Sequence, residues 1–351
     1  MTSAPSLVDS FGRTMRDLRI SITDRCNFRC LYCLPETEEA ANFYRDRFVP
    51  AKAKEINYSW KPKSQFLTYE EIERVVQVGA ECGISKIRLT GGEPLLRRNV
   101  DRLVAKLVAI PQIEDLALTT NGFLFAQNAE ALRSAGLKRI SFSLDSLDAG
   151  NFERITGRDG LKLVLDAIKQ ARELGFSPIK INAVVMRGLN DHEIVALANF
   201  AQEQEVIMRF IEFMPLDSSR AWQKDHVVSK KEILERLLER FDLEDIPPAH
   251  ASETARRWRF RNGSGEIGII APVSEPFCGN CDRLRLTSDG KIRTCLFSLH
   301  EHDLKPILRG EVSEPDLQAT LRGIVSKKEE RHHIGETDFV QPDRTMSFIG
   351  G

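Results

Sequence analysis

"RISITDRCNFRCLYC", residues 19–33, joins a short β-rich segment to three cysteines that lie within eight residues of one another. Cys26, Cys30 and Cys33 have the spacing CxxxCxxC. Structural zinc sites and closed iron–sulfur sites use four protein ligands, so three thiolates leave one metal position open. The spacing is uncommon for a zinc finger and no histidine lies close by, which favours an iron–sulfur cluster with one open iron. Zinc completed by a distant His or Asp is the alternative.

Strands and helices are predicted to alternate from about residue 18 to residue 214. The β-rich segments are residues 18–23, 86–90, 115–120, 139–145, 178–185 and 206–214, and helical stretches such as 99–110, 128–136, 160–175 and 190–204 separate most of them. Repeated β–α units imply parallel strands joined by right-handed crossovers. We therefore expect an α/β fold, an incomplete (β/α)6 TIM-like barrel. A doubly wound sheet is the competing layout.

Several of these strands carry polar residues on one face only. Strands buried on both faces read as nearly continuous apolar runs, whereas residues 18–23 alternate, with Arg19 on the polar face. The same alternation places Arg88, Ser143, Lys180 and Asn182 on the polar faces of later strands. Unpaired charge inside a protein is costly, so we expect these faces to line a lumen that binds a polar ligand. The alternative is that some of these strands are edge strands with one face in water.

Composition limits the class of protein. A chain of 351 residues with 42% hydrophobic residues can bury one large barrel or two ordinary domains. The formal net charge of −1 gives no general attraction to nucleic acid or anionic lipid, so a basic site has to be built locally. No segment approaches the roughly 20 apolar residues of a membrane span, and the N-terminus lacks the apolar core of a signal peptide. We expect a cytoplasmic protein without nucleic-acid or membrane partners, whose cysteines are ligands or catalytic groups.

A second cysteine group lies near the other end of the chain. Cys278, Cys281 and Cys295 again offer three thiolates. Between them, Arg283 and Arg285 share one face of an extended segment, and a guanidinium can donate two hydrogen bonds to a phosphate while it stays charged. We expect residues 1–224 to form the barrel and residues 225–351 to form a smaller domain that closes its open side.

The residues around the first cysteine group resemble a known superfamily. CxxxCxxC with an aromatic residue, Tyr32, before the last cysteine is similar to the signature of the radical S-adenosylmethionine enzymes, and "RLTGGEPLL" at residues 88–96 fits it. The resemblance implies that S-adenosylmethionine binds the open iron and that an electron from the cluster cleaves it to a 5′-deoxyadenosyl radical. Gly91 and Gly92 would let the backbone approach the methionine end of this cofactor.

Within that superfamily, the chain resembles the GTP 3′,8-cyclases of molybdenum cofactor biosynthesis over nearly its whole length. The matching motifs are "LRISITDRCNFRCLYCLP", "KIRLTGGEPLL", "LTTNG", "SLDSLD", "PVSEPFCGNCDRLRLTSDGKIRTCLFS" and "MSFIGG". The resemblance implies two 4Fe–4S clusters, the second binding the guanine of GTP, in a lyase that makes (8S)-3′,8-cyclo-7,8-dihydroguanosine 5′-triphosphate. It also implies an electron-donor protein and a downstream cyclic pyranopterin monophosphate synthase as partners, and leaves a homodimer open.

The resemblance assigns individual residues as well. The cofactor contacts fall on Tyr32, Gly92, Ser143 and Met214. The GTP contacts fall on Arg19, Arg88, Thr119, Lys180, Arg283, Leu284 and Arg285, with Leu284 contributing through its backbone. Arg19, Gly350 and Gly351 are expected to act in catalysis, the two glycines because a chain end without side chains can enter a narrow space beside the substrate. An ordinary core methionine and a simple strand hydroxyl are the alternatives for Met214 and Ser143.

One segment departs from the family pattern, and two other functions stay open. Residues 36–66 look longer than their family counterpart, a length that a protein surface tolerates. A radical S-adenosylmethionine enzyme acting on a peptide would also carry auxiliary cysteines, but three cysteines and the Arg283/Arg285 pair argue against it. Outside enzymes, the alternative is a zinc-stabilised module that binds RNA or protein, which the net charge near zero weakens.

Overall fold

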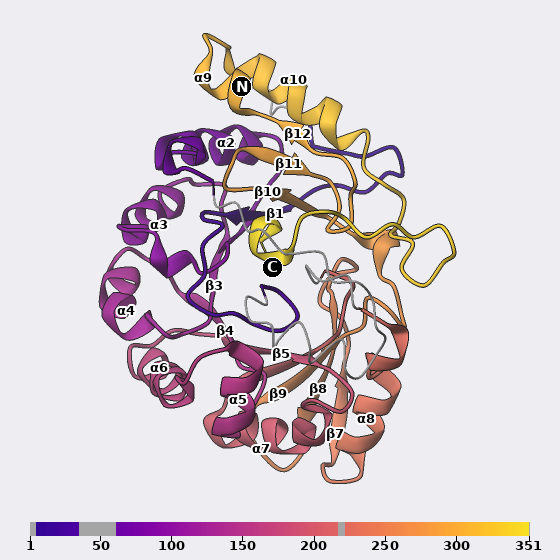
Figure 1. Cartoon of the computed structure of the whole chain (residues 1–351). Coiled ribbons are helices and arrows are strands. Elements are labelled where there is room, and N and C mark those ends of the chain that lie inside the picture. The colour runs from indigo at the N-terminus through magenta and orange to yellow at the C-terminus, as the bar shows by residue number, and fades with distance from the viewer. Residues whose placement is uncertain (1–4, 35–60, 217–221, 351) are drawn as a thin grey trace.

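The computed structural model describes residues 5–34, 61–216 and 222–350, so Gly351 and most of the segment 36–66 lie outside the described residues. In these ranges all twelve strands belong to one sheet, in the order β12-β11-β10-β1-β2-β3-β4-β5-β6-β9-β8-β7. The central strands β1 to β6 are parallel. They form an arc with helices α2, α3, α4 and α6 on its outer side (Figure 1). The predicted α/β fold is confirmed, and the arc corresponds to a partial barrel.

The elements of the arc follow one another along the first two thirds of the chain. Its strands are β1 (Asp17–Ser21), β2 (Lys86–Thr90), β3 (Asp115–Thr120), β4 (Arg139–Ser143), β5 (Ile179–Val185) and β6 (Ile207–Glu212). Its α-helices are α2 (Tyr69–Glu81), α3 (Val100–Val108), α4 (Phe125–Ser134), α5 (Ala149–Thr156), α6 (Leu161–Glu173) and α7 (Ile194–Gln204).

The remaining elements come from the last third. The strands are β7 (Leu243–Ile246), β8 (Ala255–Phe260), β9 (Glu266–Ile270), β10 (Arg283–Leu286), β11 (Lys291–Arg293) and β12 (His302–Asp303). The helices are α8 (Lys230–Leu238), α9 (Lys305–Arg309), α10 (Glu314–Val325) and α11 (Met346–Ile349). Short 3₁₀ helices are η1 (Lys63–Gln65), η2 (Pro94–Leu96), η3 (Asp191–Glu193), η4 (Lys224–His226) and η5 (Cys278–Asn280).

Local sequence signals set where the helices begin. At the start of α2, the Thr68 hydroxyl accepts a hydrogen bond from the Glu71 N–H, and the Glu71 carboxylate accepts one from the Thr68 N–H. This capping box satisfies two of the donors that a helix start otherwise leaves free. Ile72, Val75 and Val76 then recur at helical spacing and are buried in the main core. The helix therefore presents its apolar side to the sheet.

The two faces of the central strands differ in character. Leu18 and Ile20 are buried in the apolar core. The residues between them point the other way, and the register aligns these polar positions across strands: Arg285 is opposite Arg19, and Arg19 is opposite Arg88. The three arginines line one cavity. The predicted polar lumen is therefore confirmed at these positions, because a period of two holds along each parallel strand.

The chain after residue 225 extends both edges of the arc. Strand β9 pairs with β6 and continues to β8 and β7, whereas β10 pairs with β1 and continues to β11 and β12. Helix α11 lies inside the arc of strands (Figure 1). The last third thus shares the sheet of the barrel, and the division at residue 224 remains a prediction. Among the described residues, no helix combines the length and hydropathy needed to span a bilayer.

A buried ion pair joins the two ends of the chain. The Nε of Arg13 lies 2.5 Å from an Asp9 carboxylate oxygen, and both side chains are almost completely buried. The other guanidinium nitrogens of Arg13 donate to the carbonyl oxygens of Cys278, Glu329 and Glu330 at 2.6 to 2.8 Å. Loss of one partner from a buried pair leaves the other charge uncompensated. Asp9 holds the Arg13 guanidinium in place, and Arg13 in turn holds the backbone at Cys278, where the second cysteine group begins.

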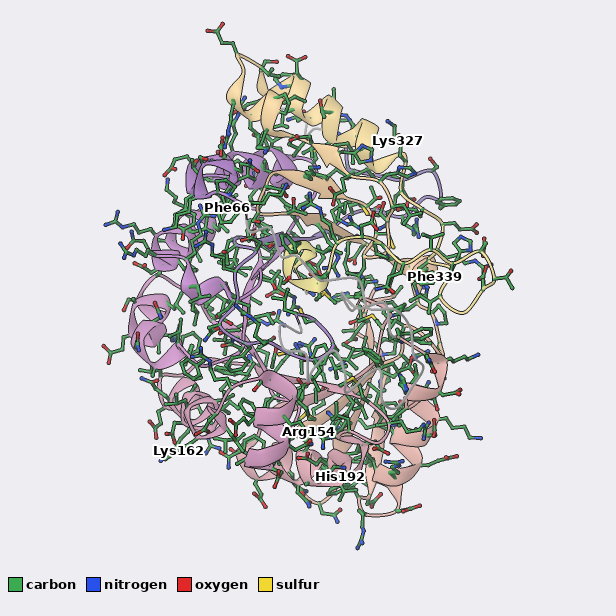
Figure 2. All side chains as sticks on the ribbon, viewed as in Figure 1. Phe66, Arg154, Lys162, His192, Lys327 and Phe339 are labelled. Atoms are coloured by element: carbon green, nitrogen blue, oxygen red, sulfur yellow. The ribbon has the colours of Figure 1, made fainter. Side chains whose placement is uncertain are left out.

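We expect Arg13→Ala to lower the free energy of unfolding by about 3–5 kcal/mol, because the buried Asp9 carboxylate would lose its opposite charge and keep only backbone N–H donors. Urea denaturation followed by circular dichroism measures this loss. The matched control is Lys162→Ala, which removes a cation on the outside of α6 (Figure 2) whose ion pair with Asp166 is exposed. Its expected effect is within about 0.5 kcal/mol. Equal losses of unfolding free energy in the two variants would contradict a stabilising role for the Asp9–Arg13 pair.

Candidate active site

The first cysteine group follows directly after β1, at the carboxyl end of the barrel strands. Cys26, Cys30 and Cys33 line a cavity of about 200 Å³. The loop is held from the side, because the Arg29 N–H donates to the Thr156 carbonyl oxygen at 2.7 Å. The carboxyl end of parallel barrel strands is where this architecture places its chemistry.

The spacing of the cysteine sulfur atoms bears on whether each group could bind a single zinc ion. Zn–S bonds of about 2.3 Å place the sulfurs of a tetrahedral site about 3.8 Å apart. All seven cysteines lie in the described residues. Within those residues, no three cysteine Sγ atoms lie within 4.8 Å of one another. Neither trio is therefore gathered as closely as the thiolates of one tetrahedral zinc ion, and three thiolates suit a 4Fe–4S cluster with one open iron.

Burial opposes ionisation of the first cysteine group. It raises the pKa of Cys26 to about 11 and that of Cys33 to about 12, and it raises the pKa of Cys30 well above its ordinary value. Cysteine binds metals as the thiolate. A bound cation therefore has to supply the stabilisation that water does not supply in this loop.

The Gly91-Gly92 turn packs directly on the cysteine loop. A Cβ on Gly92 would lie 2.3 Å from the Arg25 carbonyl oxygen, and one on Gly91 would lie 2.6 Å from the Thr23 carbonyl oxygen. Both glycines also line the 200 Å³ cavity. The interpretation from sequence attributed them to close approach of a cofactor. The structure adds that glycine is required here by the contact between two backbone segments.

Tyr32 and Ser143 line the same cavity. The Tyr32 hydroxyl donates to the Asp145 carboxylate at 2.6 Å, and the Val184 N–H donates to its other oxygen at 2.8 Å. Burial raises the pKa of Asp145 to about 6, although both hydrogen bonds lower it. Sequence reasoning singled out Tyr32 without its partner, because a contact over 113 positions leaves no local pattern.

The second cysteine group lines a larger cavity of about 410 Å³. Burial alone would raise the pKa of the Cys281 thiol. The positive charges of Arg283 and Lys328 outweigh this effect and lower the pKa to about 7. The Nε of Arg283 donates to the Cys281 sulfur at 3.3 Å. Lys328 is buried and donates to the carbonyl oxygens of Arg283 and Thr294. Sequence reasoning missed Lys328, which is far from the cysteines along the chain.

Cations dominate the larger cavity. Nine cationic side chains line it among the described residues: Arg19, Lys86, Arg88, Arg139, Lys180, Arg209, Arg257, Arg283 and Arg285. Five carboxylates line it in the same ranges: Asp17, Asp115, Glu253, Glu266 and Asp282. The excess of positive charge in a buried space calls for an anionic ligand.

Several of these cations lack a complete set of partners. Within the described residues, the Nε atoms of Arg19, Arg88 and Arg209 are buried without a hydrogen-bond acceptor. Burial, together with neighbouring cations such as Arg209, lowers the pKa of Lys180 to about 7. Burial also lowers the pKa of Arg19 to about 10, against the effect of Asp17. An acceptor with several oxygens, such as a phosphate chain, would satisfy these groups.

Arg209 is a lumen cation that sequence reasoning did not single out. It lies on β6, and its Nη2 donates to the Ser141 hydroxyl at 3.3 Å. Arg88 contacts the same hydroxyl at 3.5 Å. Met208 and Phe210, on either side of Arg209, are buried in the core. The period of two therefore places Arg209 on the lumen face, but Ile207 and Ile211 on that same face are apolar, so the sequence shows no polar alternation there.

The other predicted contact residues, Thr119 and Leu284 for GTP and Met214 for the cofactor, divide into two groups. Thr119 lines both cavities, and among the described residues its hydroxyl has no hydrogen-bond partner. Met214 also lines both cavities. Leu284, by contrast, is buried in the apolar core, on the opposite face of β10 from Arg283 and Arg285. Its side chain therefore does not reach the lumen, which agrees with the expectation that only its backbone contributes.

The C-terminal tail enters the barrel. The Gly350 carbonyl oxygen accepts a hydrogen bond from Arg285. Gly350 has a φ of +84°, and a Cβ there would lie 2.8 Å from Thr90 Cγ2 and 3.1 Å from Ser21 Cβ. Only glycine fits this backbone conformation and this gap. The structure thus places Gly350 beside the lumen cations, while Gly351 lies outside the described residues.

The two cavities adjoin each other. Five residues line both of them: Thr119, Asn182, Ile211, Met214 and Met346. The first cysteine group therefore lines the smaller cavity, and the second cysteine group and the cations line the larger cavity beside it. Such a site can hold a small cofactor at one cysteine group and an elongated anion that reaches toward the other.

Solved structures with the same fold are distantly related in sequence. Streptococcus suis SuiB bound to S-adenosylmethionine aligns with a TM-score of 0.60 at 14% identity, over 90% of this chain and 69% of that one. SuiB bound to its precursor peptide SuiA aligns with a TM-score of 0.58 at 15% identity, over 91% of this chain and 72% of that one. At this level of identity the likeness concerns the fold alone.

Sequence comparison is more specific. Residues 20–201 match the Radical SAM superfamily and residues 206–334 match Molybdenum Cofactor Synthesis C. A GTP 3′,8-cyclase of Acidothermus cellulolyticus is 45% identical over 91% of this chain and 84% of the relative. A GTP 3′,8-cyclase of Rhodopirellula baltica is 44% identical over 100% of this chain and 94% of the relative. One of Mycolicibacterium smegmatis is 42% identical over 98% of this chain and 92% of the relative. The chain therefore belongs to the GTP 3′,8-cyclase family of the radical S-adenosylmethionine superfamily.

Proposed function

We propose that this chain is a lyase that converts GTP to (8S)-3′,8-cyclo-7,8-dihydroguanosine 5′-triphosphate, an early step of molybdenum cofactor biosynthesis. The observation that carries the proposal is the cation-rich lumen that contains the second cysteine group and adjoins the cavity of the first. A nucleoside triphosphate is an elongated polyanion with a base at one end, and it matches this lumen in charge and shape.

The donor set fits the cofactors that the family uses. Cys26, Cys30 and Cys33 would hold the first 4Fe–4S cluster, and Cys278, Cys281 and Cys295 would hold the second. When bound, the first cluster supplies the electron that cleaves S-adenosylmethionine. The 200 Å³ cavity, with Tyr32, Gly92, Ser143 and Met214 in its wall, would hold that cofactor.

The protein's own residues act mainly by positioning. Arg19, Arg88, Lys180 and Arg285 would bind the triphosphate and fix the ribose between the two cavities. A reactive carbon radical attacks whichever C–H bond lies within reach, so the orientation of the ribose decides the product. Gly350 occupies the neighbouring space and helps to keep water out.

The proposal includes partners that the family implies. An electron-donor protein, a cyclic pyranopterin monophosphate synthase that acts on the product, a cytoplasmic location and a homodimer belong to it as expectations. A peptide substrate is less well supported, because the relatives that match nearly the whole chain are GTP 3′,8-cyclases. A zinc-stabilised binding module is less well supported because residues 20–201 match the Radical SAM superfamily.

We expect anaerobically reconstituted protein to contain about eight irons per chain. With a reductant, S-adenosylmethionine and GTP it should form 5′-deoxyadenosine and a cyclised nucleotide, measured by liquid chromatography and mass spectrometry. Cys26→Ala should lower the iron content to about four and abolish both products, since one cluster of four irons is lost. Cys82→Ala is the matched control, because Cys82 is buried outside both groups.

Two results would contradict the proposed reaction. The first is protein with both clusters loaded that forms neither product from GTP. The second is stoichiometric zinc, without iron, in protein purified and handled without oxygen.

We expect GTP binding to weaken as pH rises above about 7, because of Lys180. In the free protein its pKa is lowered to about 7, so the amine is protonated below that pH and neutral above it. A bound triphosphate favours the ammonium form, so binding at higher pH takes up a proton. The dissociation constant should then rise by up to about tenfold per pH unit. Calorimetric titration of loaded protein with GTP, without reductant, measures it.

The variant Lys180→Met isolates this contribution. It should bind GTP about 10- to 100-fold more weakly at pH 6.5, through loss of a charge-assisted hydrogen bond. Its affinity for GTP should no longer fall as pH rises above 7. Lys162→Met, at an exposed lysine on α6, should keep both the affinity and the profile. An identical pH profile in wild type and Lys180→Met would contradict a role for Lys180.

A further inference from the structure

A buried ion pair holds the start of the C-terminal tail. Arg344 forms a two-pronged contact with Asp289, in which each of its terminal nitrogens lies 2.9 Å from a different carboxylate oxygen. Its Nε lies 2.8 Å from a Glu301 carboxylate oxygen. Two parallel N–H···O bonds give such a pair a fixed geometry as well as strength. The tail is thereby joined at Arg344 to the turn between β10 and β11.

The acceptor side of this pair is built into the core. The Asp289 side chain is only 2% exposed, and that of Arg344 is 18% exposed. The Thr287 hydroxyl donates to Asp289 at 2.6 Å, and the Lys61 ammonium lies 2.9 Å from its other oxygen. Thr287 and Lys61 therefore hold the Asp289 carboxylate in place independently of Arg344.

The residues after Arg344 run between the two cavities. Met346 lines both cavities, and Ser347 lines the smaller one. Cys33 of the first cysteine group lines that smaller cavity too. Gly350 then lies against Ser21 and Thr90 and accepts a hydrogen bond from Arg285. Within six residues the tail thus shares a cavity with the first cysteine group and contacts a cation of the lumen.

Helix α11, Met346–Ile349, cannot hold this position by itself. Helices of one turn are unstable in water because nucleation is unfavourable. Its place therefore depends on tertiary contacts at its two ends. Ile349, which packs with Leu216, Phe297 and Ile334, provides an apolar contact near the far end. The contact just before the helix is the Arg344–Asp289 pair. Its two parallel hydrogen bonds have a fixed geometry and so set the direction in which the tail enters the barrel.

We propose that Arg344 is a positioning residue, whose ion pair with Asp289 holds the tail so that Gly350 stays beside Arg285 and the substrate. Arg344 lines neither cavity, so it acts through the tail and not by touching the ligand. The catalytic consequence rests on the proposed function. The placement of the tail does not.

The test is Arg344→Met in the holoenzyme, which keeps the length of the side chain and removes the fork. Hydrogen exchange followed by mass spectrometry reports on the tail, where the Gly350 N–H is bonded to the Met346 carbonyl oxygen at 2.8 Å. Release of the tail should raise exchange at residues 346–350 by about tenfold or more, with exchange in β1 to β6 unchanged. The amount of cyclised nucleotide per 5′-deoxyadenosine should fall, because the reductive cleavage does not need the tail.

Two further variants separate positioning from a general loss of stability. Arg331→Met is the matched control, because Arg331 lies in the same part of the chain and has an exposed ion pair with Glu336. It should leave exchange and product ratio at wild-type values. Arg344→Lys keeps the charge without the fork, and should recover part of the product ratio.

Each outcome decides the proposal. Unchanged exchange at residues 346–350 in Arg344→Met overturns it, whatever the activity. Faster exchange with an unchanged product ratio also overturns it, because Arg344 would then be structural only. If the wild type forms no cyclised nucleotide, the proposed function fails, and the exchange measurement still decides whether Arg344 holds the tail.

Discussion

The mutual repulsion of buried cations is the constraint on which the rest of this structure depends. Arg19, Arg88 and Arg285 stand side by side on adjacent strands; the side chains of Arg88 and Arg285 are buried, and so is the Nε of Arg19. Such a group is unfavourable unless an anion joins it. The barrel walls hold the cations in place in spite of this cost, because the opposite faces of the same strands are buried under the helices.

Parallel pairing explains why the cations and the cysteines meet in one site. A period of two along each strand gives every strand one inward face, and the register carries that face from β10 through β1 to β2. The loops that follow the strands then open at one end of the barrel. Because β10 pairs with β1, the second cysteine group is brought to the same lumen as the first, although 245 residues separate Cys33 from Cys278.

The sequence predicted the parts of the site that have a local pattern. Arg19, Arg88 and Lys180 follow from alternation within their strands, and the two cysteine groups follow from their spacing. Arg209 obeys the same rule but sits among hydrophobic residues, so its strand reads as an apolar run. Lys328 and Arg344 could not be found in this way, because their partners lie in other elements and only the fold brings them together. Gly350 came from resemblance to a family and not from any property of the tail itself.

The tail and the lumen cations stabilise each other in a way that links them to the substrate. Arg285 donates one hydrogen bond to the Gly350 carbonyl oxygen, and its guanidinium has further N–H donors that can bind a phosphate oxygen at the same time. A ligand that binds the cations stabilises the folded state in proportion to its affinity and concentration. Part of that stabilisation falls on Arg285, and through it on the position of the chain end. The tail is therefore expected to be most firmly ordered when the lumen is full, which is when its glycines are needed.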